Sequence, residues 1–152
     1  MNDSILQLDE KTDPATKQML VNVVKRKKKY EQYKAKHLLV MSCTLFLTFC
    51  YLIYLYFSIV TPYSYSFAAM FSAYVNNSLN LYFLILTLGT YGLMNLLHGK
   101  REKAEKEFHA LRCEIIDKSK DLWKKEESWS NRHLVFEMMK QNYDINLYHE
   151  NK

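Results

Sequence analysis

Charge is absent from the middle of this chain of 152 residues. Residues 37–99 contain no Asp, Glu, Lys or Arg, although these four types make up 24% of the sequence. A water-soluble domain carries charged side chains over its whole surface, so an uncharged run of this length argues against one. The run instead predicts a segment surrounded by lipid.

Glycine and proline are also scarce, with three glycines and two prolines in the chain. Three glycines cannot form the glycine-rich loops that hold phosphate, and no GxSxG, HExxH, CxxC or P-loop motif is present. We therefore expect a protein that is not an enzyme, and we expect neither a cofactor nor a small-molecule substrate.

The three cysteines do not form a disulfide framework. Cys43 and Cys50 both lie in the uncharged run, and Cys113 lies in the polar sequence that follows it. On a helix, Cys43 and Cys50 are about 10 Å apart along the axis, which is too far for a disulfide. All three thiols are expected to be reduced.

Two apolar blocks occupy residues 37–60 and 79–98. As helices they span about 36 Å and about 30 Å, which matches the thickness of a bilayer. Residues 61–78 form the connection, and its apolar stretch, residues 67–75, spans only about 14 Å as a helix. We expect two transmembrane helices joined by an extracytoplasmic loop whose apolar stretch lies on the outer leaflet.

The basic residues predict the orientation of this hairpin. Residues 1–36 hold nine Lys and Arg against five Asp and Glu, and the loop between the two spans holds no Lys or Arg. Four basic residues follow the second span within residues 100–106. Basic residues stay on the cytoplasmic side, so we expect a two-pass plasma-membrane protein with both termini in the cytoplasm.

The two spans are expected to pack through weakly polar faces. Helical spacing places Thr44, Thr48 and Tyr51 on one face of the first span, and it places Thr87, Tyr91 and Asn95 on one face of the second. Interhelical hydrogen bonds between such residues hold membrane helices together. The same polar residues allow an alternative function, a small oligomeric ion-conducting, proton-conducting or transport component.

The N-terminal flank is predicted to be a basic helix. Residues 1–13 are polar and expected to be flexible, and then Asp13 and Pro14 favour a helix start. No breaker follows before residue 60, so the cytoplasmic helix of residues 14–36 can continue into the first span. Its block Lys25, Arg26, Lys27, Lys28 and Lys29 is a candidate for anionic lipid, although the simpler interpretation is that it only sets topology. No base-reading module accompanies the block, so nucleic acid is not expected as a partner.

The C-terminal flank, residues 99–141, is predicted to be largely helical, followed by a tail over residues 142–152. We expect one helix of about 30 residues, a break at residues 128–131, and a short helix over residues 132–141. Apolar residues recur every seven positions, as in half of a coiled-coil seam. The candidate partner-binding residues are Phe108, Leu111, Ile115, Leu122, Trp129 and Phe136. They could pack against the N-terminal helix or against another protein, and the sequence leaves both open.

One set of side chains resembles a metal site. Glu105, His109 and Cys113 are four residues apart, and His98 and Glu102 precede them. Three ligands on one straight helix extend over about 12 Å, which is too far for a single tetrahedral ion. A solvated helix face explains the pattern better, and no metal is expected.

Three stretches of the chain carry a resemblance to a known family. TDPATKQML near the start, EKEFHALRCEIIDKSKDLW and FEMMKQNYDINLYHEN resemble the YpbF-like family of small two-span membrane proteins of Bacillus-type bacteria. The resemblance implies a bacterial plasma-membrane protein without an assigned biochemical activity, and it assigns no role to any residue.

These observations predict an all-α membrane protein. Its fold is a two-helix transmembrane hairpin with long cytoplasmic amphipathic helices at both ends. We expect it to contact membrane lipid and to act by protein–protein interaction, as a scaffold, regulator or accessory subunit, with another protein or as a homo-oligomer.

Overall fold

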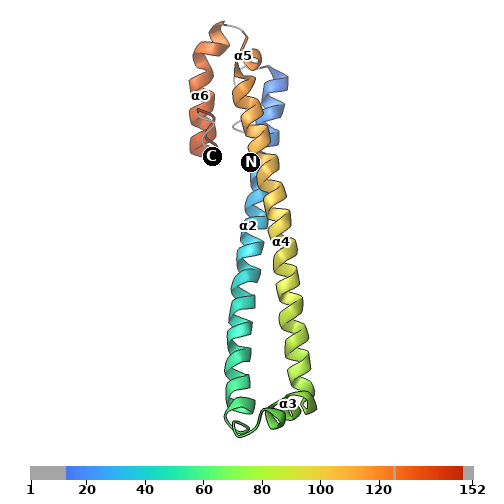
Figure 1. Ribbon diagram of the computed structural model, residues 1–152. Coiled ribbons are helices and arrows are strands. Elements are labelled where there is room, and N and C mark those ends of the chain that lie inside the picture. Colours follow the sequence, from blue (N-terminus) through green and yellow to red (C-terminus); the bar gives the residue numbers. More distant parts are fainter. Residues whose placement is uncertain (1–12, 125, 149–152) are drawn as a thin grey trace. The chain divides into compact units, whose positions relative to one another are not determined.

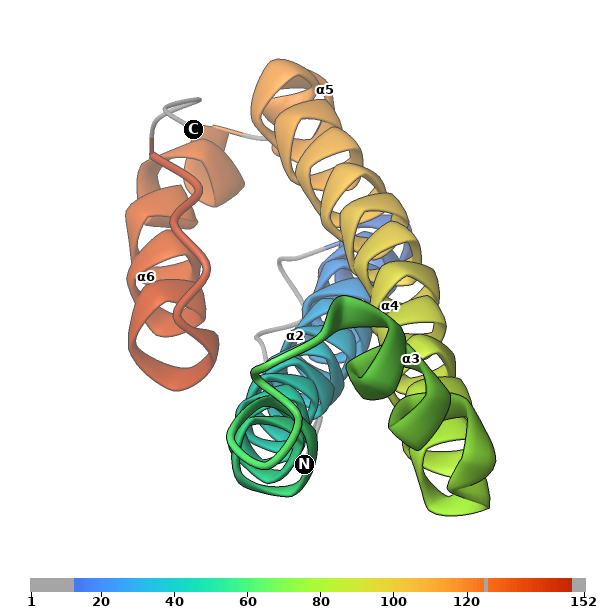
Figure 2. The ribbon, with the colours of Figure 1, turned by 60° about the horizontal axis from the view of Figure 1, so that its bottom comes forward.

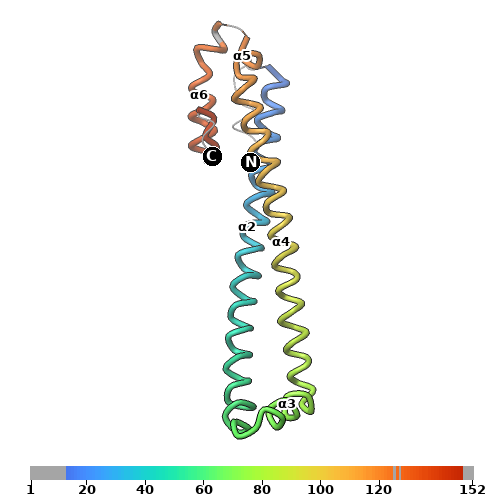
Figure 3. The backbone as a smooth tube through the Cα atoms, viewed as in Figure 1, coloured from blue at the N-terminus to red at the C-terminus, as the bar shows by residue number. Residues whose placement is uncertain are grey.

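The computed structural model describes residues 13–124 and 126–148, and over these residues it contains helices and no strand. Figures 1 and 3 show the elements in chain order. They are α2 (Pro14–Leu55), the π-helix η1 (Tyr56–Val60), α3 (Phe67–Asn76), α4 (Ser78–Asp117), α5 (Ser119–Leu122) and α6 (Glu126–Tyr143).

The chain forms two compact units, and the long helices α2 and α4 contribute to both. We call Tyr33–Arg101 the hairpin unit. The other unit combines Met1–Gln32 with Glu102–Lys152, and we call it the helical unit. Each is described by itself below.

Helix α2 begins at Pro14, as predicted, and the Lys17 N–H donates to the Asp13 carbonyl oxygen at 3.1 Å. The helix has no break before Leu55, where it widens into η1. In η1 the Thr61 N–H reaches back to the Tyr56 carbonyl oxygen at 2.9 Å, and the Thr61 hydroxyl donates to the same oxygen. Pro62 follows and has no N–H to continue the helix, so the first long helix ends here.

In the hairpin unit, α3 is a ten-residue helix at the turn between η1 and α4 (Figure 2). Tyr51 of α2 holds this corner, because its hydroxyl lies 3.1 Å from the Tyr74 hydroxyl and donates to the Asn80 carbonyl oxygen at 3.2 Å. The Asn80 amide nitrogen donates in turn to the Tyr74 carbonyl oxygen at 3.0 Å. The turn is thus fixed by polar groups that lie mostly inside the unit.

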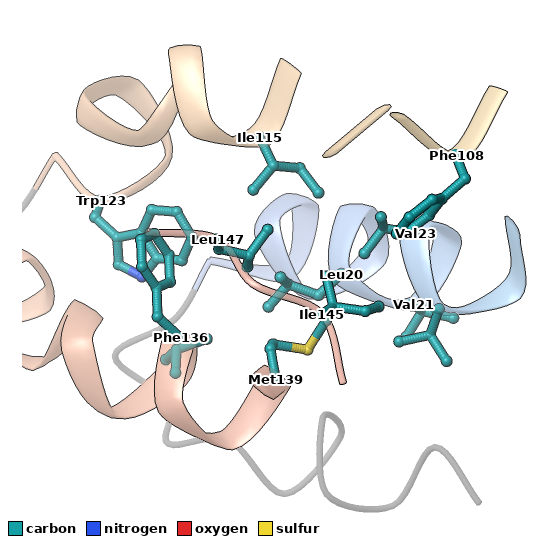
Figure 4. Packing of buried hydrophobic residues seen from close by; sticks show 12 residues of the cluster. Leu20, Val21, Val23, Phe108, Ile115, Trp123, Phe136, Met139, Ile145 and Leu147 are labelled. Atoms are coloured by element: carbon teal, nitrogen blue, oxygen red, sulfur yellow. The ribbon is translucent and has the colours of Figure 1, made fainter. Parts of the chain in front are cut away.

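The helical unit has an apolar core built from segments at both ends of the chain. Leu20 and Val23 of α2 meet Ile115 of α4, and Met139 of α6 closes the cluster (Figure 4). All four side chains are fully buried. The polar flanks before and after the apolar hairpin therefore pack on each other within one chain, and packing against another protein stays a prediction.

The predicted helix break is in a different place. Helix α4 ends at Asp117, the short α5 follows, and the residues 128–131 expected to form a break lie inside α6. The reason is the packing of Trp123, which is 2% exposed and meets the ring of Phe136 edge to face at 5.5 Å. The chain turns at this tryptophan, which is not part of the seven-residue repeat.

Candidate functional site

The hairpin unit exposes its apolar side chains instead of burying them. Both long helices are long and apolar enough to cross a membrane, and the most apolar windows of Pro14–Val60 and Ser78–Asp117 are 11% and 0% buried within the structure. Among large side chains, Phe46 is 72% exposed and Leu96 is 66% exposed. Contiguous exposed apolar surface of this kind is rare on soluble monomers and marks a site of contact with a membrane, a protein or a ligand.

The least exposed side chains of α4 in this unit form a row spaced three, four or seven residues apart. Near the start of this row, the ring of Phe83 stacks on Tyr51 of α2 with centroids 5.7 Å apart. The row continues from the buried Asn80 through partly buried side chains, which are Thr87, Thr90, Met94, Leu97 and Arg101. Thr44 and Tyr51 of α2 are buried and Thr48 is half-buried, so the structure brings these three predicted residues and Thr87 into the packing. Tyr91 and Asn95 are exposed, one position away from the row, and the structure does not bring them together with α2.

The threonine hydroxyls do not bridge the two helices. Thr44 donates to the Val40 carbonyl oxygen at 2.8 Å, and Thr87 donates to the Phe83 carbonyl oxygen at 2.7 Å. Both acceptors lie one turn back on the same helix, as is common for threonine in a helix. Of the six predicted packing residues, it is Tyr51 whose side chain makes a hydrogen bond to the other long helix.

Two histidines lie at the end of the hairpin unit where the chain enters and leaves it, which is the end far from α3 along both long helices. The imidazole rings of His37 and His98 meet edge to face with centroids 5.3 Å apart, and His37 is 8% exposed. One helical turn beyond His98, the Nε of Arg101 is buried and has no hydrogen-bond partner among the described residues. This end of the unit also carries Lys34, Lys36 and Lys100.

The basic block at residues 25–29 lies in the helical unit, where three of its five side chains contact other parts of that unit. Arg26 and Lys29 approach the Glu107 carboxylate at 3.6 Å and 3.4 Å. Lys27 is engaged more deeply, with a side chain only 12% exposed. The anionic-lipid role predicted for this block therefore rests mainly on Lys25, which is exposed, and Lys28, which is half-buried.

Lys27 caps the C-terminal end of α6. Its ammonium group donates to the carbonyl oxygens of Tyr143 at 2.8 Å and Asp144 at 2.6 Å, and to the Asp144 carboxylate at 2.9 Å. Asp144 has a φ of 52°, the left-handed conformation that often ends a helix. The ammonium group also holds the pKa of the Asp144 carboxyl below its ordinary value, through a hydrogen bond and then through charge. The sequence could not predict this role for Lys27, because it is one of five adjacent basic residues that look alike in the sequence.

The residues after the cap are packed into the helical unit, although the sequence predicted only a tail. Ile145 and Leu147 are each 1% exposed. Between them, the Asn146 carbonyl oxygen accepts a hydrogen bond from the Nε of Arg112 at 2.8 Å. Two apolar residues within a short polar stretch give no periodic signal, so sequence reasoning missed this segment.

The six candidate partner-binding residues fall into three groups. Phe108, Ile115 and Phe136 are buried in the core, and Leu111 and Leu122 are half-buried against it. Trp129 is 39% exposed, and the Arg132 guanidinium lies over its ring at 3.8 Å. The seven-residue repeat is thus largely accounted for by packing within the chain, and partner binding by these residues stays a prediction.

The described residues contain no group of three or more His, Cys, Asp or Glu side chains placed to hold a metal ion. Glu105 accepts a hydrogen bond from the Tyr30 hydroxyl at 3.3 Å, and all three cysteines are free thiols. Two cavities in the hairpin unit, of about 380 Å³ and about 470 Å³, have no charged residue and no histidine in their walls. The titratable side chains in their walls are Cys50, Tyr51, Tyr54 and Tyr63.

Comparison with known proteins gives a family without a described activity. A family model described as "Protein of unknown function (DUF2663)" matches residues 19–150. The chain is 38% identical over 146 residues to the "Uncharacterized protein YpbF" of Bacillus subtilis (strain 168), and the match covers 96% of each chain. No solved structure matches the chain.

Proposed function

The chain belongs to the DUF2663 family, and we propose that it is a two-pass plasma-membrane protein that acts through protein–protein contacts and not by catalysis. In this proposal the hairpin unit anchors the chain in the bilayer. The helical unit lies in the cytoplasm, where it offers a folded surface to a partner.

The exposed apolar surface of the hairpin unit is the observation that supports membrane insertion. The transfer of apolar surface from water to hydrocarbon is favourable by about 25 cal/mol per Å². Side chains such as Phe46, Phe57 and Leu96, each about two-thirds exposed or more, contribute most when lipid surrounds them. The helical unit needs no such environment, because its apolar side chains already form a core.

The position of the charges supports cytoplasmic termini. The end of the hairpin unit near His37 and His98 carries four basic residues, and the connection at residues 61–77 carries none. Basic residues are retained on the cytoplasmic side of a membrane. The exposed face of α3, with Phe67, Phe71 and Val75, then lies at the outer surface, where an apolar and aromatic helix contacts the headgroup region.

Cysteine labelling in intact cells tests this topology. We expect a membrane-impermeant maleimide to label Ser64→Cys in the connection, while Cys113 reacts only after the cells are opened. Cys43 and Cys50 are replaced by serine in all samples, and Cys113 is also replaced by serine in the Ser64→Cys sample, so that each sample contains one thiol. Labelling of Cys113 in intact cells, or release of the chain from membranes by alkaline carbonate, would contradict the proposal.

A partner surface on α6 is supported by the contact between Trp129 and Arg132. Tryptophan and arginine dominate the binding energy of many interfaces, and here the two side chains stack on each other at the surface. Leu134, which is 56% exposed, adds apolar area to the same helix. We expect in-membrane crosslinking to capture one specific protein, or a second copy of the chain, through this surface.

The matched variants for this test are Trp129→Ala and Leu122→Lys. Trp129→Ala removes an exposed ring, so capture should fall while the fold persists. Leu122→Lys places a charge against the core and disturbs the fold itself. If Trp129→Ala leaves capture unchanged, α6 is not the partner surface.

A second function is supported by Tyr91 and Asn95. Both polar side chains are exposed on the outside of the hairpin unit, where a two-span chain would need them in order to assemble into a conducting oligomer. Proteoliposomes that contain the purified chain would then show ion or proton flux, and Asn95→Leu would reduce it. Equal flux in both samples would rule this function out.

A further inference from the structure

The hairpin unit has a cationic end. Within Tyr33–Arg101 the basic residues are Lys34, Lys36, Lys100 and Arg101, and the unit contains no Asp or Glu. Each of the four lies within three residues of His37 or His98 along its helix, and these two rings are in contact. The four cations therefore gather at one end of the unit.

Arg101 differs from the exposed lysines in its surroundings. It is half-buried and continues the row of less exposed α4 residues. Its Nε is buried and donates to no acceptor among the described residues. A buried donor without an acceptor is costly, and a guanidinium is well suited to the oxygens of a phosphate group.

The carboxylates nearest to Arg101 in the sequence do not accept a hydrogen bond from its Nε. Glu105 accepts a hydrogen bond from Tyr30, and Glu107 is approached by Arg26 and Lys29. Glu102 is exposed and adjoins Arg101 in the sequence. The Nε of Arg101 is buried without a hydrogen bond to any of these groups.

The position of Arg101 also matches the depth of lipid phosphates. On α4 it lies three residues beyond His98, the last residue of the predicted span, which is about 4.5 Å along the axis. In an inserted hairpin the Arg101 side chain reaches the headgroup region just outside the hydrocarbon.

We propose that this end of the hairpin unit binds the phosphate of an anionic phospholipid, with the Arg101 guanidinium as its ligand. The proposal rests on the membrane insertion proposed above. It moves the lipid-binding site from the block at residues 25–29, where Arg26, Lys27 and Lys29 contact other groups, to the end of the spans.

Native mass spectrometry of the full-length chain in detergent, titrated with phosphatidylglycerol, tests this site. We expect Arg101→Gln to weaken phosphatidylglycerol binding about tenfold, the effect of losing one charge-assisted hydrogen bond. Arg101→Lys keeps the charge but removes the Nε donor, so it should weaken binding several-fold. Lys140→Gln, at an exposed lysine of α6 outside both basic clusters, should bind as the wild type does.

Four outcomes would overturn the proposal. The first is that Arg101→Lys binds as the wild type does, which would mean that charge alone attracts lipid. The second is that Lys140→Gln weakens binding as much as Arg101→Gln, and the third is that Arg101→Gln has no effect. Displacement of the lipid by millimolar inorganic phosphate would show that free phosphate is the ligand.

The maleimide experiment separates this proposal from the proposed function. If Arg101→Gln keeps the wild-type labelling pattern and loses lipid binding, both proposals are supported. If Arg101→Gln keeps both, only the lipid site is wrong. If the wild-type chain is not in the membrane, the proposed function fails first and the lipid site fails with it.

Discussion

The two units place the same kind of apolar side chain in opposite environments. In the helical unit Leu20, Ile115 and Met139 are fully buried against one another. In the hairpin unit Phe46, Phe57 and Leu96 point away from the chain. Helix α2 supplies residues to both units, so apolar content alone does not decide which side chains are buried. Burial depends on whether the helix also has a polar face. A helix with one polar face can bury its apolar face against a neighbour, whereas two paired helices that are apolar all round leave most of their apolar side chains exposed.

The largest difference between the units should appear on truncation of a core residue. Ile115→Ala should destabilise the helical unit by about 2–5 kcal/mol, since it removes a fully buried side chain. Leu88→Ala, at a 61% exposed position in the hairpin unit, should leave the helical unit unchanged. Both tryptophans lie in the helical unit, so tryptophan fluorescence during urea unfolding in detergent reports on this unit alone. Equal shifts for the two variants would remove the distinction.

A smaller effect is expected from the cap of α6. Lys27→Met should destabilise the helical unit by about 1–2 kcal/mol, because the carbonyl oxygens of Tyr143 and Asp144 lose a charged donor. Hydrogen–deuterium exchange should rise over residues 143–148. Lys25→Met is the matched control, since Lys25 belongs to the same basic block but is exposed. Unchanged exchange in Lys27→Met would mean that the cap does not hold the segment.

Acid should weaken the same contact. The pKa of the Asp144 carboxyl is lowered in the folded chain, so its contribution to stability is complete at neutral pH. The contribution begins to fall below about pH 5 and is lost as the pH passes through the lowered pKa. Asp144→Asn should flatten this part of the stability curve, which the tryptophan fluorescence measures. A curve that keeps its full slope in Asp144→Asn would assign the acid dependence to other groups.

The smallest effects should come from the hairpin unit and should separate its hydroxyl groups. Tyr51→Phe removes hydrogen bonds to Tyr74 and Asn80 and should cost about 0.6 kcal/mol, the average for such bonds in membrane proteins. Thr44→Val should cost less, because the Thr44 hydroxyl donates within its own helix. Hydrogen–deuterium exchange of α3 in lipid nanodiscs measures both. A larger effect for Thr44→Val would restore the predicted interhelical role of this threonine.

The helices of the hairpin unit follow closely from the sequence. A helix start at Pro14, the absence of Gly and Pro before Pro62 and an uncharged run that begins at His37 leave little choice for α2. The rotation of α4 was harder to predict. The polar side chains of Tyr91 and Asn95 predict that these two residues pack against α2. The structure instead places Thr90 and Met94, one position earlier, on the row of less exposed residues. One position is about 100° around a helix, and a lipid-facing helix has no amphipathic pattern to fix that angle.

In the helical unit the sequence predicted the seven-residue repeat but not the contacts that complete the core. Trp123, Ile145 and Leu147 lie outside the repeat, and their burial depends on how the chain turns after α4. The Lys27 cap likewise joins residues more than a hundred positions apart. Such long-range contacts arise from the assembled fold and leave no local pattern in the sequence.

The helical unit needs residues from both sides of the hairpin, and this has a consequence for biosynthesis. Leu20 and Val23 emerge from the ribosome long before Met139 and Ile145, which complete the same core. With the spans inserted as proposed, the early segment must wait for both passes through the bilayer and for the synthesis of Met139 and Ile145. A chain that inserted only one span would leave the two halves of the core on opposite sides of the membrane, unable to fold and open to proteolysis. In this proposal the helical unit can fold only when both spans are correctly inserted.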